Sequence, residues 1–455
     1  MHPYCMILRS LTVLVFTVLS AILPAMAQIE QERAERSLLQ PISYEVAAFF
    51  GEDTSKAIIN VHYRIGENFF IFVRNEASGQ GSEYVAHGEL VVEILNEQKV
   101  SVVRDIRQIS LTRGTAMRET DHALDLQGAM SFSVPAGTYT VVFSLDDRES
   151  GRSFLERTRR VTATIPKLAP LDISNPILIH SPAKVVSIDN LLPVNRGGNV
   201  LYGGRGGILS QVYQPDTLNI LAIRWRLQGQ LDGLGPRVQE FDGTEYVMRN
   251  GLLKLTTQNG SMRYGTVPSA FRWIACYIRL PFEKLEPGSF KLDIEYSSGQ
   301  AIKKQTLSFH VVWPNKPFSL INPELAIDAL RHIATEDEIA ALQSGPPARR
   351  AEEFHSFWKS RARDTTIAYN EVMAEYYYRV DEALRKFSTM REGDGYKTDR
   401  GRIYILYGPP PKTDKVLQPG GAPTEIWTYE RLRRRFVFID PSRNGTFVLS
   451  QTENL

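Results

Sequence analysis

Many short segments in which apolar and polar residues alternate constrain the fold of this chain more than any other feature of its sequence. Between residues 41 and 166 they follow one another, separated by Gly-, Asp- and Asn-containing turns, without intervening helical patterns. Alternation gives a strand one apolar and one polar face, as in an antiparallel sheet that is buried on one side. We therefore expect an antiparallel, immunoglobulin-like β-sandwich over residues 41–166. Its clearest strand patterns are Ile42–Phe50, Ala57–Tyr63, Asn68–Val73, Gly88–Leu95 and Thr138–Leu145.

A second region has the same pattern and predicts a second sandwich over residues 170–314, with residues 166–170 as the linker. Residues 135–145 and 287–296 each begin with a Pro/Gly turn, continue as an alternating strand with an aromatic residue, and precede a Ser-Gly turn. Two unrelated hairpins would look alike in this way. A tandem repeat and a shared hairpin pattern therefore both stay open. Further strand patterns cover Leu218–Gln228 and Leu252–Thr257.

Two glycine- and arginine-rich stretches, Asn195–Gly198 and Gly203–Gly207, lie in this second region. Loop amides of this kind can hold a phosphate at the start of a helix. Here the following residues, Ile208–Tyr213, have a strand pattern, and no Gly-Lys-Ser/Thr is present. The pattern favours a flexible or tightly turning loop over a nucleotide site.

The N-terminus has the pattern of a signal peptide. Arg9 precedes an uncharged apolar run from Leu11 to Leu23, and Ala25-Met26-Ala27 has the small-x-small pattern of a cleavage site. The alternative is a retained anchor, but the run is shorter than the ~20 residues that span a bilayer. We expect removal of residues 1–27, a linker over 28–40, and export to the periplasm, the cell envelope or the medium, with no remaining transmembrane anchor.

Charge and cysteine content exclude some functions. The chain has 53 basic and 51 acidic residues among 455, so no overall field favours nucleic acid or an anionic membrane. Only Cys276 follows the predicted cleavage site, and its alternating aromatic-flanked context predicts a buried strand cysteine rather than a nucleophile. The length predicts about three domains.

The pattern changes after Trp313–Pro317, and residues 318–455 are predicted to form an α+β domain. The longest helical stripe runs from Tyr369 to Phe387, with apolar residues every three or four positions. The other expected helices are Ile321–Leu330, Glu336–Leu342 and Ala351–Arg361. The expected strands of a small antiparallel sheet are Arg402–Tyr407, Glu425–Tyr429, Arg434–Ile439 and Thr446–Ser450.

Between the long helix and that sheet lies the segment Gly395–Arg402, of sequence Gly-Tyr-Lys-Thr-Asp-Arg-Gly-Arg. Side chains of Thr398 and Asp399 can accept hydrogen bonds from nearby backbone amides. Gly401 would allow a positive φ before the next strand, and Tyr396 would pack beside the turn. This interpretation predicts a structural turn without a ligand.

Several separated pieces of the C-terminal region resemble the GWxTD domain, a module of bacterial exported proteins without an established biochemical activity. They are the Phe357-Trp358-Lys359 helix, Glu375–Val380, the signature at Gly395–Asp399, Tyr404–Pro410 and Glu425–Tyr429. The resemblance extends from about Pro323 to the end. Tyr396 stands where the family usually has Trp, and Pro411 stands where an acidic residue commonly follows the prolines.

A catalytic role would need paired carboxylates, a metal cluster, or a nucleophile with a base. The candidates are Asp394, Asp399, Glu425, Asp440 and His355. Their spacing shows no ligand pattern, and no Gly-x-Ser-x-Gly is present, so we expect neither a cofactor nor a metal. The alternative is a hydrolase of an envelope polymer that uses Asp399 with a second carboxylate.

A non-catalytic binding or assembly role is favoured because aromatic residues gather near one Gly/Pro loop system, and aromatic faces suit sugars and peptides. The partner would be an envelope protein or polysaccharide rather than nucleic acid. The basic run Arg431–Arg435 could meet an acidic partner, although a solvated hairpin turn explains it as well. The proposed motif or binding residues are Gly395, Tyr396, Thr398, Asp399, Gly401, Tyr404, Tyr407, Gly408, Pro409, Pro410, Glu425, Trp427 and Tyr429.

Overall fold

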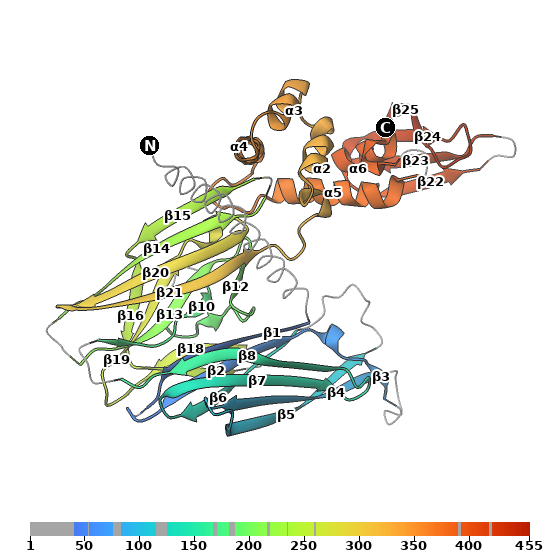
Figure 1. Ribbon diagram of the computed structural model, residues 1–455. Helices are drawn as coiled ribbons and strands as arrows, with labels where there is room; N and C mark the ends of the chain where they lie inside the picture. The colour runs from blue at the N-terminus through green and yellow to red at the C-terminus, as the bar shows by residue number, and fades with distance from the viewer. Residues whose placement is uncertain are drawn as a thin grey trace, which may run out of the picture. The chain divides into compact units, whose positions relative to one another are not determined.

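The computed structural model of the chain divides into two compact units (Figure 1), which we describe separately. The first contains residues up to 229 and residues 239–314, and the second contains residues 230–238 and 315–455. The predicted signal peptide, N-terminal linker and inter-sandwich residues 167–170 lie outside the described residues. The structure describes residues 41–52, 54–75, 83–114, 125–166, 171–181, 187–215, 219–233, 235–258, 261–389, 393–417 and 421–455.

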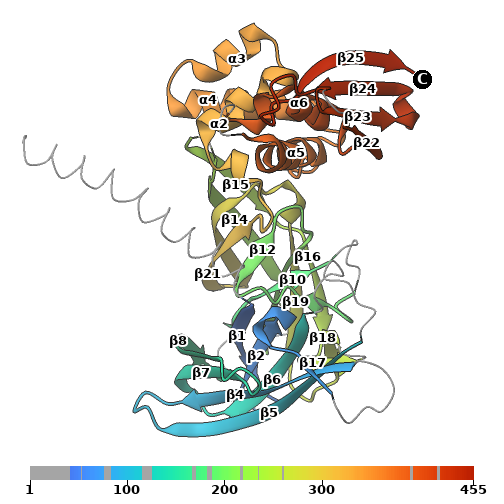
Figure 2. The same ribbon diagram turned by 90° about the vertical axis from the view of Figure 1, so that its right-hand side faces the viewer.

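The first part of the chain is an antiparallel β-sandwich, as predicted. One sheet has the order β1-β2-β6, and the other has the order β3-β4-β7-β8 with β5 beside β4 (Figure 2). A shared core of aliphatic and aromatic side chains fills the space between them. The strands are β1 (Ile42–Phe50), β2 (Ala57–Ile65), β3 (Val73–Arg74), β4 (Glu83–Leu95), β5 (Ser101–Gly114), β6 (Leu126–Val134), β7 (Gly137–Asp147) and β8 (Ser153–Ala163).

The strand predicted over Asn68–Val73 is wrong. The segment begins as the short 3₁₀ helix η1 (Glu67–Phe69), and only Val73 extends into β3. Phe69 and Phe70 are both buried, at 2% and 4% exposure. Two neighbouring residues of a strand on a sandwich point to opposite faces, so a turn of helix is needed to bury both rings together.

The next region contains two larger sheets and a two-stranded sheet, in which Leu252–Gln258 pairs with Ser261–Val267. One larger sheet has the order β11-β10-β13-β19-β16 with β9 beside β13, and the other has the order β12-β21-β20-β14-β15. Strands β12 and β21 pair in parallel, whereas the pairs β10–β13, β13–β19 and β20–β21 are antiparallel. The strands are β9 (Asp172–Ile173), β10 (Ile177–His180), β11 (Leu192–Pro193), β12 (Asn199–Leu201), β13 (Gly206–Tyr213), β14 (Leu221–Leu231), β15 (Arg237–Gly243), β16 (Tyr246–Asn250), β17 (Leu252–Gln258), β18 (Ser261–Val267), β19 (Trp273–Leu280), β20 (Gly288–Ser298) and β21 (Ala301–Val312).

The similar segments at 135–145 and 287–296 have the same structural role. They form β7 and β20, each of 11 residues and each an interior strand that continues into a hairpin. Cys276 is fully buried in β19, as predicted. Burial raises the pKa of its thiol, which makes the thiolate scarce.

The two sandwich regions pack into one unit through β1 and a polar junction. Ala47 and Phe49 of β1 contribute to a core shared with Leu209 and Tyr277. Oε1 of the buried Glu45 accepts hydrogen bonds from backbone N–H groups in the predicted glycine-rich loop, at 3.2 and 2.6 Å. The N–H groups of this loop therefore bind a carboxylate of the same chain, where those of a nucleotide site would bind a phosphate.

The second unit is an α+β structure in which helices precede a small antiparallel sheet of order β22-β23-β24-β25. The four helices predicted before residue 388 are present. The helices are α2 (Pro323–Asp328), α3 (Glu336–Gln343), α4 (Pro347–Lys359), α5 (Glu371–Phe387) and α6 (Asp399–Tyr407). The strands are β22 (Lys412–Val416), β23 (Thr424–Tyr429), β24 (Arg434–Ile439) and β25 (Val448–Asn454).

Local sequence explains where these helices begin. Asn322 and Asn370 cap α2 and α5 with side-chain oxygens, and Thr335 forms a capping box with Glu338 at α3. The stripe of α5 buries Tyr377 and Phe387 among its apolar residues. Within the described residues, the helices are too short or too polar to span a bilayer.

The signature junction as candidate functional site

Two glycines let three backbone segments meet at the signature. A Cβ on Gly395 would lie 2.3 Å from the carbonyl oxygen of Ala383 in α5. A Cβ on Gly401 would lie 2.0 Å from the carbonyl oxygen of Gly395. Gly401 belongs to the first turn of α6 and has no positive φ, so the predicted reason for this glycine is wrong. Both positions need glycine because a neighbouring backbone fills the space of a side chain.

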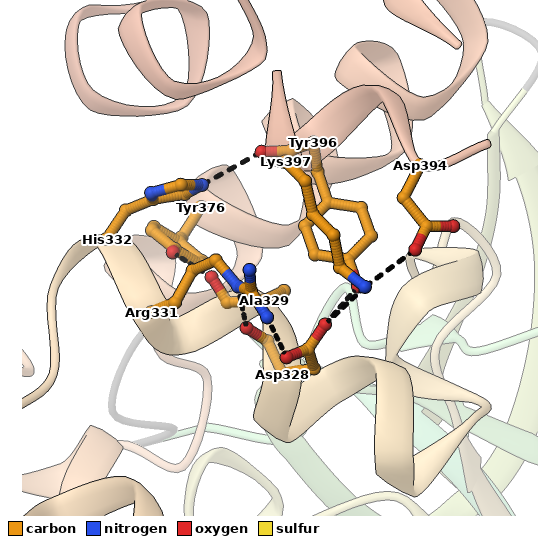
Figure 3. Close-up of polar contacts among 8 residues, drawn as sticks. All are labelled: Asp328, Ala329, Arg331, His332, Tyr376, Asp394, Tyr396 and Lys397. Atoms are coloured by element: carbon orange, nitrogen blue, oxygen red, sulfur yellow. Dashed lines mark hydrogen bonds and ion pairs between the residues drawn. The ribbon is translucent and has the colours of Figure 1, made fainter. Parts of the chain in front are cut away.

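Tyr396 attaches the signature to the end of α2 (Figure 3). Its ring is buried, and its hydroxyl donates a hydrogen bond to the carboxylate of Asp328. Nζ of Lys397 lies 3.1 Å from the same carboxylate and 2.7 Å from that of Asp394. Arg331 also pairs with Asp328. Tyrosine in place of the family's tryptophan therefore keeps both an aromatic ring and a polar hydrogen that can be donated.

A second set of contacts links the same two segments. Nε2 of His332 lies 2.8 Å from the carbonyl oxygen of Tyr396, and the hydroxyl of Tyr376 donates to the carbonyl oxygen of Ala329 at 2.6 Å (Figure 3). These residues come from η4 (Ala329–His332), α5 and η5 (Gly395–Lys397). The signature segment is thus hydrogen-bonded to a neighbouring turn through both backbone and side chains.

Electrostatics keep this cluster in one protonation state near neutral pH. Burial, followed by the hydrogen bond to Asp328, raises the pKa of Tyr396 to about 12. Burial alone would raise the pKa of Asp328, but hydrogen bonds from Tyr396, Arg331 and Lys397 lower it overall. Burial lowers the pKa of His332. A neutral phenol, an ionised carboxylate and a neutral imidazole suit a fixed network better than proton transfer.

Thr398 begins a helix rather than the predicted strand. Its Oγ1 accepts from the backbone N–H of Gly401 at 3.0 Å and donates to the carbonyl oxygen of Gly395 at 2.8 Å. This is an N-cap, so the predicted amide contact of Thr398 is present. The strand predicted over Arg402–Tyr407 is wrong because α6 covers these residues.

Asp399 makes a distant contact as well as a local one. Its Oδ2 accepts from the backbone N–H of Leu449 in β25 at 2.8 Å. Its Oδ1 lies 3.1 Å from the guanidinium of Arg402, one turn along α6. A carboxylate in the first turn also interacts favourably with the positive end of the helix dipole. Asp399 therefore connects α6 to the last strand.

Arg400 and Glu425 make a second connection between α6 and the sheet. Their ion pair is 3.1 Å long, and both side chains are largely buried. The other oxygen of Glu425 accepts from the indole N–H of Trp427 at 2.8 Å. The Arg400 guanidinium also lies over the rings of Phe447 and Phe387, at 4.2 and 5.2 Å. Both oxygens of this carboxylate thus have partners.

The aromatic residues proposed for binding lie mainly in the core. Tyr404, Trp427 and Tyr429 are buried, and Tyr407 is half-buried. Trp427 packs against Phe438 with ring centroids 4.8 Å apart. These side chains join α6 to one face of the sheet and offer little surface to a sugar or peptide. Tyr404 is buried and Leu406 is 36% exposed, because both belong to α6 rather than to a strand.

The Gly-Pro-Pro segment ends α6. Gly408 has φ 83°, and its N–H donates to the carbonyl oxygen of Tyr404 at 2.8 Å. The hydroxyl of Tyr429 donates to the carbonyl oxygen of Gly408 at 2.7 Å. Pro409 is exposed and Pro410 is half-buried. A glycine with positive φ followed by proline is a common way to end a helix.

The remaining catalytic candidates do not gather with Asp399. Asp440 is buried and accepts from the backbone N–H groups of Asn444 and Gly445, at 3.2 and 2.7 Å, while His355 lies on α4. Among the described residues, no hydrogen bond joins Asp399 to Glu425 or Asp440. Among those same residues, no group of three or more His, Cys, Asp or Glu side chains could hold a metal ion.

The edge strand β22 was missed from the sequence. Every residue from Lys412 to Val416 is exposed, and β22 lies at one end of the sheet order, beside β23. An exposed strand has no apolar face, so it lacks the alternation that identifies a half-buried strand. The prolines before it and the strand pattern after it were the available signals for a hairpin.

Comparison with known proteins identifies the C-terminal part. Residues 296–451 match the family model of the GWxTD domain. No curated protein sequence matches the chain. Among solved structures, a crystal structure of red sea bream transglutaminase matches with 11% sequence identity, 59% of this chain and 31% of that chain covered, and a TM-score of 0.15. The chain thus spans about a third of that protein, and a similarity at this level carries no argument.

Proposed function

The chain carries a GWxTD domain, and we propose that it is an exported protein of the cell envelope or periplasm that acts by binding or assembly rather than by catalysis. The domain binds its partner through the exposed edge of its C-terminal sheet. The signature itself has a structural role, because it fixes α6 against α5 and the sheet.

One observation carries this proposal: β22 is an edge strand with all five residues exposed. Among the described residues it pairs only with β23, so the backbone groups on its other side are available to a further strand. Leu417, which follows it, is 79% exposed. An extended peptide that adds a strand there would gain main-chain hydrogen bonds, with contacts to Val416 and Leu417.

The charges on this edge favour an acidic partner. Lys412 and Lys415 stand on β22, and the single carboxylate of the strand, Asp414, lies 3.4 Å from Nζ of Lys412, so Lys415 is the charge in excess. Lysines on an edge strand also discourage pairing with a second copy of the same strand, because like charges would then lie close together. We therefore propose an extended, acidic segment of an envelope protein as the partner.

The contacts at the signature count against the alternative, a hydrolase that uses Asp399 with a second carboxylate. Asp399 is bonded to Leu449 and Arg402, and Glu425 is bonded to Arg400 and Trp427. Both carboxylates connect structural elements. A hydrolase would instead need one of them to be available to a substrate or water molecule.

A pair of proline variants tests the edge. Successive residues of an edge strand point their N–H groups in opposite directions. One of the two variants, Thr413→Pro or Asp414→Pro, therefore removes an N–H that points outward, and the other removes an N–H that points toward β23. The full chain, tagged and cross-linked in an envelope fraction, would be compared with both variants by quantitative mass spectrometry. We expect the variant that keeps wild-type stability to lose the partner.

Two results would contradict the proposal. In the first, both variants fold and capture the same set of proteins as the wild type. In the second, the wild-type chain releases soluble fragments from purified envelope polysaccharide and a folded Asp399→Asn variant does not. Export is tested separately by cell fractionation and by mass spectrometry of the mature N-terminus, which we expect at Gln28.

A further inference from the structure

A cavity of about 520 Å³ lies in the first unit. Its lining includes Asp125 and Gln127 from the first sandwich, and His180, Arg196 and Arg205 from the second sandwich region. Two of these five side chains are arginines, and Asp125 is the one acidic side chain among them. The cavity is therefore bounded by both sandwich regions and has an excess of positive groups.

The backbone on both sides of Arg196 is held in place. The buried Asn195 donates from its side-chain amide to the carbonyl oxygen of Tyr63 at 2.7 Å. The N–H of Arg196 donates to Glu45, and its carbonyl oxygen accepts from the side-chain amide of Asn199 at 3.1 Å. Asn195 and Gly197 both have positive φ, at 50° and 66°. This fixed loop determines where the Arg196 side chain enters the cavity.

The guanidinium of Arg196 lacks a counterion among the described residues. It makes neither a hydrogen bond nor an ion pair there. Asp125 is the nearby carboxylate, but it is already paired with Arg64. Burial, together with repulsion from Arg64, lowers the pKa of Arg196 to about 10, against a smaller opposing effect of Asp125. Partial burial of an unpaired guanidinium is costly, and an oxyanion ligand would offset that cost.

We propose that this cavity binds a small ligand through a phosphate or carboxylate group held by Arg196. Two parallel N–H···O bonds from a guanidinium fit either oxyanion. Arg205 also lines the cavity, whereas the carboxylate of Asp125, although paired with Arg64, disfavours an anion placed beside it. No residue of β22 lines this cavity, so the proposal stands independently of the proposed function.

Isothermal titration calorimetry of the full chain tests this site. The probes are inorganic phosphate and succinate at equal ionic strength, with sodium chloride as the reference. We expect at least one probe to bind, and Arg196→Gln to weaken its binding by about tenfold or more, because a hydrogen-bonded charge pair is lost. Arg160→Gln, an exposed change on β8, should bind as the wild type does.

The two probes distinguish the chemistry, and a second variant protects the test against misfolding. Arg196→Lys keeps the charge and most of the side chain, and it should bind more weakly than the wild type because a lysine lacks the bidentate geometry. The proposal is overturned if neither probe binds the wild-type chain. It is also overturned if a folded Arg196→Gln or Arg196→Lys variant binds as tightly as the wild type.

Discussion

The backbone N–H of Leu449 donates a 2.8 Å hydrogen bond to the carboxylate of Asp399, across 50 residues of sequence. The aspartate that ends the family signature thus stands at the start of α6 and holds the first residues of β25. Beside it, Arg400 reaches Glu425 of β23. The signature is therefore a junction that fixes one helix to two strands. These structural contacts explain why Asp399 and Arg400 are polar.

The Asp399 contact predicts a difference between two substitutions. Asp399→Ala leaves the N–H of Leu449 without its acceptor and should lower the free energy of unfolding by about 1–3 kcal/mol. Asp399→Asn keeps an acceptor oxygen and should recover much of that loss. Urea denaturation of both variants measures the effect, with Asp414→Ala on exposed β22 as the control. A fully stable Asp399→Ala variant would show that the bond has no structural role.

Gly401 predicts an unusual response to alanine. In an exposed helix, Gly→Ala stabilises by about 0.8–1 kcal/mol. At Gly401 the new Cβ would lie 2.0 Å from the carbonyl oxygen of Gly395, so the η5 backbone must move. We expect Gly401→Ala to lower the melting temperature and Gly393→Ala, whose Cβ meets nothing within 4 Å, to leave it nearly unchanged. Equal melting temperatures for the two variants would contradict the close packing.

Strands and helices with one face in water were predictable from the sequence. In β14, buried and exposed residues alternate almost without exception, and in α5 the apolar stripe is the buried face. Helix α6 was missed because the consecutive residues Ile403, Tyr404 and Ile405 are all buried, which hides the helical period. Its start and end signals were present, namely Thr398 as the cap and Gly408 before proline.

The contacts of the site were less predictable than its elements. Alternation predicted the strand Glu425–Tyr429, and in β23 Glu425 and Trp427 lie on one face and share a hydrogen bond. It could not tell that this face meets the core, so an expected binding surface is buried. Asp328 lies 68 residues from Tyr396, and only the tertiary fold brings them together. Trp427→Ala is accordingly a core deletion and a poor probe of recognition.

Tyr396 and Asp328 predict a stability change that depends on pH. Tyr396→Phe removes a hydrogen bond to a charged acceptor, so the variant should be less stable than wild type at pH 7. Because the pKa of Asp328 is lowered in the folded state, its ionised carboxylate stabilises the fold at pH values above its unfolded pKa of about 3.9. This stabilisation is lost as the pH falls through the folded pKa. The difference between the proteins should therefore shrink below pH ~4. Unfolding midpoints from pH 7 to 3 measure it, and a constant difference would contradict the coupling.

His62 predicts acid sensitivity of the first unit. It is fully buried in β2, and its Nε2 lies 2.8 Å from the hydroxyl of the buried Tyr264 in β18, so it joins the two sandwich regions. Burial lowers the pKa of His62 to about 3. The folded state disfavours the charged imidazole, so the neutral ring contributes to the free energy of unfolding at pH values above the unfolded pKa of about 6.5. That contribution is lost as the pH falls toward the folded pKa.

The His62→Gln variant isolates this effect, since glutamine can hydrogen-bond to Tyr264 but does not titrate. Glu45, whose pKa burial raises, titrates in both proteins, so the comparison between them removes its contribution. We expect the free energy of unfolding of the wild type, measured by urea denaturation, to fall more steeply than that of the variant between pH 6.5 and 4. If the free energy of unfolding depended on pH in the same way for the two proteins, the prediction would be wrong. The imidazole would then be protonated in the folded state, or acid would open the junction between the sandwich regions before the unit unfolds. Hydrogen exchange of the β2 and β18 amides at pH 4.5 distinguishes these two cases, because only opening of the junction exposes both strands.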